Sequence, residues 1–194
     1  MRSDASAGIR RAIAALTALV LLAVAASASA QTGGSPAPGG PAGSGAPQSA
    51  PAVGKARKAK LIRKSGRAIA PPGAPAAVVN AIAAGNAIRK RPYVWGGGHA
   101  SFESRGYDCS GAVSYVLHAA GLLASPLPSG PLMSWGVPGK GRWITVMANR
   151  GHTYVVIAGL RFDTSSYGSG GSGPRWRATK RRPRGFAVRH WTGY

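Results

Sequence analysis

A low-complexity stretch near the N-terminus limits which part of this chain can fold. Residues 31–53 consist almost entirely of Gly, Pro, Ala and Ser, and the exceptions are Gln31, Thr32, Gln48 and Val53. Such a composition offers too little apolar surface for a core and is typical of a flexible tether. A packed domain must therefore be built from the residues that follow it, which are enough for one domain of the 194-residue chain.

The residues before this tether have the pattern of a secretory signal. A basic segment with Arg2, Arg10 and Arg11 precedes an apolar run over residues 12–26, and Ala28-Ser29-Ala30 gives the small residues of a cleavage site. The apolar run is short for a membrane span, which needs about 20 residues. We predict that residues 1–30 are a signal peptide cleaved after Ala30 and that the protein is secreted, with an uncleaved anchor as the alternative.

The charge of the chain is strongly unbalanced. It has 25 Lys and Arg against 4 Asp and Glu, a formal net charge of +21, so it will seek polyanions. Basic residues are dense at positions 55–67, and we expect residues 31–74 as a whole to be a disordered linker. No basic motif interleaved with aromatic residues is found, and export argues against nucleic acid as a partner. Anionic cell-wall polymers that bind the basic segments are the better expectation.

Order is expected to begin near residue 75. Apolar spacing predicts a helix over 76–89 and another over 110–120, followed by strands at 143–148 and 153–158. A shorter run at 160–163 follows, and residues 124–141 are expected to form a loop. Helices followed by an antiparallel sheet define the α+β class. We predict one domain over residues 75–194, which ends in a basic C-terminal tail.

The chain has one cysteine, Cys109. Exported proteins use cysteines in pairs, so a single one is a buried inert thiol, an intermolecular bridge or a reactive thiolate. Cys109 lies at or just before the start of the 110–120 helix, where the helix dipole stabilises a negative sulfur. This position favours the reactive thiolate.

A histidine that could serve as base stands at the start of a later strand. His152 opens the 153–158 strand, and Asp163 lies eleven residues further on, where it can reach His152 across a hairpin. Such a histidine can hold an ion pair with the thiolate and protonate a leaving amine. The backbone N–H of Cys109 can donate to the developing oxyanion. We expect the other histidines, His99, His118 and His190, to be structural or exposed. Their scatter lacks metal-ligand spacing, so neither a metal nor another cofactor is predicted.

Three motifs in order resemble the NlpC/P60 family of cell-wall cysteine peptidases. They are Pro92-Tyr93-Val94-Trp95-Gly96-Gly97, then Asp108-Cys109-Ser110-Gly111, then Gly151-His152. The resemblance covers about residues 76–165. It implies a papain-like fold, in which the cysteine heads a helix packed on an antiparallel sheet that bears the histidine. It also implies hydrolysis of amide bonds in peptidoglycan stem peptides, often between D-glutamate and a diamino acid.

The resemblance also implies roles for single residues. Cys109 takes the place of the nucleophile, His152 that of the base, and Asp163 that of the third polar residue. Tyr93, Asp108 and Ser110 match positions that line the cleft and bind substrate. From the residues alone, Asp108 can equally be a helix N-cap, and Tyr93 can be a core aromatic.

The chain departs from the family pattern ahead of the histidine. The family often has Gly-Asp there, whereas this chain reads Gly141-Arg142, and an aspartate is a less usual third residue. From the three motifs and the predicted export, we nevertheless predict a monomeric, cell-wall-associated bacterial endopeptidase that acts on peptidoglycan. An amidase that cuts the sugar–peptide junction and a non-catalytic basic wall-binding protein remain as alternatives.

Overall fold

A computed structural model of the chain describes residues 57–165 and 172–194. These residues belong to the second of two units in the chain, Ala50–Tyr194. The predicted signal peptide, the predicted tether and the linker as far as residue 56 lie outside the described residues. Within the described ranges, no helix is both long and apolar enough to cross a membrane.

A six-stranded antiparallel sheet forms the centre of the described unit. Its strand order is β3-β8-β4-β5-β6-β7, so the C-terminal strands flank the central β4–β5–β6 meander. The strands are β3 (Val137–Pro138), β4 (Ile144–Asn149), β5 (His152–Ile157), β6 (Leu160–Asp163), β7 (Arg175–Arg177) and β8 (Ala187–His190). The helices are α1 (Ala76–Ile88), α2 (Cys109–Ala119) and the short α3 (Ser129–Leu132). This arrangement confirms the predicted α+β class.

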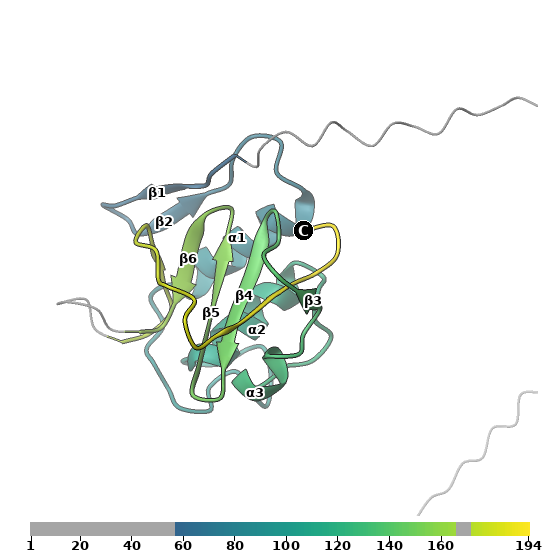
Figure 1. Ribbon diagram of the computed structural model, residues 1–194. Coiled ribbons are helices and arrows are strands. Elements are labelled where there is room, and N and C mark those ends of the chain that lie inside the picture. Colours follow the sequence, from purple (N-terminus) through teal and green to yellow (C-terminus); the bar gives the residue numbers. More distant parts are fainter. Residues whose placement is uncertain (1–56, 166–171) are drawn as a thin grey trace, which may run out of the picture. The chain divides into compact units, whose positions relative to one another are not determined.

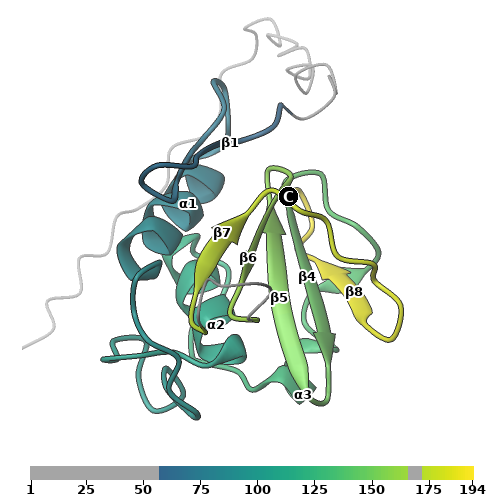
Figure 2. The same ribbon diagram turned by 90° about the vertical axis from the view of Figure 1, so that its left-hand side faces the viewer.

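The core lies between the helices and one face of the sheet. Figures 1 and 2 show α1 and α2 on the same side of the β4–β5–β6 meander. Val146, Val155 and Phe162 have no exposed surface, and they meet Val78 of α1 and Val116 of α2 in one apolar cluster. Alternation along each strand leaves the other face to a mixture of polar and apolar residues, among them Thr145, Met147 and Arg161.

A glycine in the middle of α1 has a packing role. Gly85 lies in the middle of α1, although glycine is a poor helix former. In the structure, a Cβ at Gly85 would lie 2.5 Å from the Trp176 ring. Only glycine therefore lets α1 approach the tryptophan of β7 this closely.

The prediction of a disordered linker up to residue 74 is wrong for its last part. β1 (Lys60–Ile62) and β2 (Arg67–Ile69) form an antiparallel hairpin. The buried Asn86 side chain binds both the N–H and the C=O of Ala68, at 2.9 and 2.8 Å, and accepts from Trp176 Nε1 at 3.1 Å. The N–H of Ala59 also donates to the Ala158 carbonyl. These long-range bonds order a segment whose local composition predicts none.

The sequence predicts that the C-terminal residues are a basic tail, but in the structure they contribute two strands to the sheet. β7 pairs with β6, and β8 pairs with both β3 and β4. The segment between β7 and β8, residues 178–186, crosses the sheet on the face opposite the helices, as the yellow ribbon in Figure 1 shows. We call it the strap. The stretch 124–141, expected to be a loop, contains α3 and β3.

Candidate active site

Cys109 is the first residue of α2 and is half-buried. Asp108 precedes it in an extended conformation, and its carboxylate accepts from the N–H of Gly111 at 2.8 Å, which is the geometry of an N-cap. The first N–H groups of a helix lack intrahelical acceptors and carry partial positive charge. The sulfur of Cys109 therefore stands where a thiolate is stabilised.

The glycine-rich segment before α2 packs directly on its first turn. A Cβ at Gly111 would overlap the carbonyl oxygen of Gly97 and lie 3.0 Å from the Gly98 Cα. The N–H of Asp108 donates to the same Gly97 carbonyl at 3.1 Å, and Gly98 has a positive φ of 86°. The glycines thus let two backbone segments touch, and this contact fixes the loop beside Cys109.

Asp108 is held by a network that sequence reasoning did not find. Its carboxylate accepts from the N–H of Gly96 at 3.1 Å and lies 2.9 Å from His99 Nε2. The same histidine nitrogen is 2.8 Å from Ser110 Oγ. Asp108 is only 5% exposed, so the structure places it in a helix cap and a buried network. His99, which was expected to be structural or exposed, connects the glycine loop to this cap.

His152 and Asp163 come together across the β5–β6 hairpin. The register pairs Val155 with Phe162, so the start of β5 lies beside the end of β6. His152 Nε2 is 3.0 Å from Asp163 Oδ1 and 3.0 Å from Ser165 Oγ. Asp163 is 2% exposed and also accepts from the N–H of Ser165 at 2.9 Å. The predicted pairing of His152 with Asp163 is present, and Ser165 is an addition to it.

Two arginines hold the other oxygen of Asp163. Arg161 Nε lies 3.4 Å from Asp163 Oδ2, and Arg181 Nη1 lies 3.5 Å from it. Arg181 comes from the strap and also donates to Ser165 Oγ at 3.0 Å. Burial alone raises the pKa of Asp163, but the hydrogen bonds from His152 and Ser165 outweigh it and hold this pKa well below the usual range. Asp163 is therefore a carboxylate at neutral pH.

The environment of His152 favours its charged form. Burial lowers the pKa of His152, while hydrogen bonds to Asp163 and to Cys109 raise it, with the net result that this pKa rises from 6.5 to about 9. Because Nε2 faces Asp163 and Ser165, the nitrogen available to Cys109 is Nδ1. The imidazole thus stands between the sulfur and the carboxylate and is protonated at neutral pH.

An exposed apolar rim lies next to Cys109. Burial, followed by the nearby Cys109 and Asp108, raises the pKa of the Tyr93 phenol, which shows that Tyr93 is within electrostatic reach of the sulfur. Tyr93 is 39% exposed and Trp95 is 87% exposed. Neither is a core aromatic, so both are available to a ligand. From the residues alone Tyr93 could be a core aromatic, and its exposed surface excludes that alternative.

Within the described ranges, no group of three or more His, Cys, Asp or Glu side chains lies close enough together to hold a metal ion. What the site offers is a sulfur at a helix start, an imidazole held by a buried carboxylate, and an exposed rim. The fold and the site together define an α+β protein with a Cys–His–Asp constellation.

Comparisons with known proteins find only distant structural similarity. No family model and no curated protein matches the chain. Among solved structures, a hypothetical invasion protein of Mycobacterium tuberculosis is 23% identical over 61% of this chain and 63% of its own, with a TM-score of 0.45. An NlpC/P60 family protein from Bacillus cereus is 20% identical over 60% of this chain and 40% of its own, also at 0.45. The chain thus spans less than two thirds of the length of either one.

Proposed function

We propose that this protein is an exported cysteine peptidase that hydrolyses amide bonds in peptidoglycan stem peptides. The observation that carries the proposal is the position of His152 between Cys109 and Asp163. A thiolate needs a positive neighbour, and the hydrogen bond to Cys109 together with a pKa of about 9 makes His152 that neighbour at neutral pH.

The proposed reaction begins from the thiolate–imidazolium pair. Cys109 Sγ attacks the amide carbonyl carbon, and the carbonyl π electrons move to oxygen. The tetrahedral intermediate then collapses, the C–N bond breaks, and His152 gives its Nδ1 proton to the leaving amine. This leaves a thioester on Cys109 and a neutral imidazole. Water then attacks the thioester while His152 takes its proton, and the C–S bond breaks to give the acid and the original ion pair.

The oxyanion of each intermediate would form near the start of α2. Backbone N–H groups there point along the helix axis and lack intrahelical acceptors. The N–H of Cys109 is the proposed donor, and such preorganised donors are commonly worth about 3–4 kcal/mol in a transition state. Asp108 caps the helix through the Gly111 N–H, which leaves the Cys109 N–H to the substrate in this proposal.

The choice of substrate rests on the sequence motifs and on the exposed rim. The ordered motifs around Tyr93, Cys109 and His152 resemble those of cell-wall peptidases. Tyr93 gives exposed aromatic surface near the sulfur, on which a peptide or a sugar ring can pack, and Trp95 two residues further on is more exposed still. The predicted signal peptide and the net charge of +21 suit a protein that works outside the cell on an anionic polymer.

The test is digestion of purified peptidoglycan, with mass spectrometry of the soluble products. We expect wild type to release muropeptides, and we expect Cys109→Ala and His152→Gln to release none. Cys109→Ala should keep the melting temperature of wild type within a few degrees, whereas His152→Gln should melt lower because Asp163 loses its partner, and circular dichroism at the assay temperature checks that it is still folded. His190→Gln serves as the matched control, because it removes a histidine outside the site and should keep activity. Equal release by wild type and Cys109→Ala would refute the proposal.

The same spectra separate the alternatives. New termini within the stem peptide identify an endopeptidase, and a free lactyl group on the sugar identifies an amidase. A wild-type protein that binds the wall, releases nothing and keeps its binding in Cys109→Ala would be the non-catalytic wall-binding protein.

A further inference from the structure

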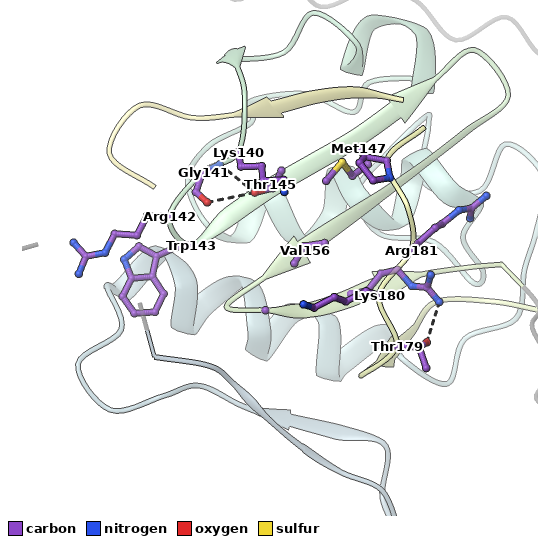
Figure 3. Close-up of a pocket in the computed structure, with 13 residues that line it drawn as sticks. Lys140, Gly141, Arg142, Trp143, Thr145, Met147, Val156, Thr179, Lys180 and Arg181 are labelled. Carbon is purple, nitrogen blue, oxygen red and sulfur yellow. Dashed lines mark hydrogen bonds between the residues drawn. The ribbon is translucent and has the colours of Figure 1, made fainter. Parts of the chain in front are cut away.

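A cavity lies away from Cys109, on the face of the sheet opposite the helices. Its volume is about 310 Å³. The strap forms one wall, and the other walls are formed by the first half of β4, by the segment before it and by the turn between β5 and β6. Figure 3 shows Thr145, Met147, Val156 and Lys180 between the sheet and the strap, with Arg142 at one end and Arg181 at the other and the helices behind the sheet. Neither Cys109 nor His152 lines this cavity. It is therefore separate from the thiol of the proposed active site.

The lining of the cavity has one sign of charge. Among its lining residues, all within the described ranges, five are basic and none is acidic: Lys140, Arg142, Arg161, Lys180 and Arg181. Lys140 and Arg142 come from the segment before β4, whereas Lys180 and Arg181 come from the strap, so two distant stretches of sequence bring these charges to one place. Clefts lined by one sign of charge concentrate the field and attract counter-ions.

Much of the remaining lining of the cavity is apolar, so it suits a ligand with a hydrocarbon part rather than a bare ion. Trp143, Met147 and Val156 line it beside the basic residues, and Pro183 adds apolar surface from the strap. The guanidinium of Arg142 lies over the Trp143 ring, with its carbon 5.6 Å from the ring centre. A ligand that fits must therefore carry negative charge and a small carbon body together.

We propose that this cavity binds a phosphodiester unit of an anionic surface polymer. Phosphate oxygens can accept from several guanidinium and ammonium groups at once, and five basic residues are more than a single carboxylate can engage. A volume of about 310 Å³ is at the small end of ligand pockets and suits one phosphate with an attached glycerol or sugar unit. The proposal does not depend on peptidase activity, because neither Cys109 nor His152 takes part in it.

The cavity also touches the proposed active site through two shared residues. Arg161 and Arg181 line the cavity, and both contact Asp163 Oδ2. For this reason the test variants leave these two arginines intact and change only the three exposed basic residues, Lys140, Arg142 and Lys180.

The experiment measures binding of glycerophosphoglycerol, a small phosphodiester, by calorimetry and by Trp fluorescence in the Cys109→Ala background at fixed ionic strength. Inorganic phosphate and acetate are the comparison ligands. We expect saturable one-to-one binding of the diester, weaker binding of inorganic phosphate, which lacks the carbon body, and none of acetate. Trp143→Phe should remove the fluorescence change and keep the calorimetric signal.

The decisive comparison is between two triple variants of equal charge. Lys140→Ala/Arg142→Ala/Lys180→Ala should weaken binding of the diester about tenfold or more, because it removes three charged donors from the cavity. Lys60→Ala/Arg63→Ala/Lys64→Ala, in the β1–β2 hairpin, removes the same charge and should change it less than about twofold. A single Lys180→Glu variant should also weaken binding, and it guards against misfolding of the triple variant.

Three results would overturn the proposal. The first is the absence of saturable diester binding, and the second is an equal loss in both triple variants, which would show non-specific attraction by net charge. The third is tighter binding of acetate than of the diester, which would assign the cavity to carboxylates. Failure here leaves the peptidase proposal standing, since peptidoglycan digestion is measured separately.

Discussion

The pH dependence of stability should reveal the His152–Asp163 pair. The pKa of His152 is raised above its unfolded value of 6.5 to about 9, so this group stabilises the folded state fully below pH 6.5 and loses that contribution as pH rises through about 9. At about 1.4 kcal/mol per unit of pKa, the gap corresponds to about 3 kcal/mol of unfolding free energy. We expect Asp163→Asn to remove most of this pH dependence, because it removes the hydrogen-bonded charge that raises the pKa of His152.

The assay is urea unfolding followed by Trp fluorescence at pH 6 to 10, together with an NMR titration of the His152 ring. The Asp163→Asn variant should be less stable than wild type at pH 6, by about 3–5 kcal/mol, since one partner of a buried pair is lost. The difference should shrink by about 2–3 kcal/mol between pH 6.5 and pH 10. In the titration, wild-type His152 should change charge near pH 9, and the variant well below that.

His190→Gln is the matched control for this series. His190 lies in β8, with its Nδ1 3.1 Å from the Gly139 carbonyl oxygen, and its loss should leave the wild-type slope between pH 6.5 and 9 in place. The reasoning is refuted if Asp163→Asn shows the same fall in stability over this range as wild type, or if wild-type His152 titrates near 6.5.

Three further substitutions test single contacts. Asn86→Leu should cost about 2–4 kcal/mol and speed hydrogen exchange in the β1–β2 hairpin, because it leaves buried backbone groups unpaired, while Asn80→Ala on the exposed side of α1 should do neither. Gly111→Ala should cost about 1–3 kcal/mol in urea unfolding and lower peptidoglycan turnover, because its methyl group overlaps the glycine loop before α2. Ser165→Ala should cost about 0.5–1.5 kcal/mol and leave the NMR pKa of His152 close to 9, since the carboxylate and not the hydroxyl raises it. Unchanged hydrogen exchange in Asn86→Leu would contradict the first expectation, and unchanged peptidoglycan turnover in Gly111→Ala the second. A clearly lower pKa of His152 in Ser165→Ala would contradict the third.

The cluster of Cys109, His152 and Asp163 was accessible from sequence because each of its members stands at the end of a regular element. The apolar spacing after Asp108 marks a helix start, and the short connection Ala158-Gly159 fixes which residues meet across the β5–β6 hairpin. These are local patterns, and local patterns are what a single sequence displays.

The parts that sequence reasoning missed depend on long-range contacts. The β1–β2 hairpin is ordered by Asn86 and Trp176, which lie 18 and 90 residues from their partners. His99 joins the Asp108 cap only because the glycine loop folds back on α2. Pairings at such separations carry no periodic signature, so composition alone assigned the hairpin to the disordered linker.

The C-terminal strap was missed for a different reason. Its run of basic residues resembles a solvated tail, and charge runs usually are solvated. Here Arg181 lies over the rings of Tyr154 and Phe186, at 5.4 and 5.1 Å from their centres, and contacts Asp163. Cation–π contacts and the buried Asp163 carboxylate hold the strap on the sheet. The strap thereby joins the phosphodiester cavity to the residue that orients His152.

The central claim is that His152 holds Cys109 as a reactive thiolate, and the rate of iodoacetamide alkylation against pH tests it most directly. Since the chain has one cysteine, the mass of the intact protein reports that residue alone. We predict that wild type at pH 6 reacts at least about tenfold faster than His152→Gln, because only the wild type has an imidazolium beside the sulfur, and that the two rates converge at high pH. Identical profiles for the two proteins, with both rates falling about tenfold per pH unit below pH 8, would contradict the account.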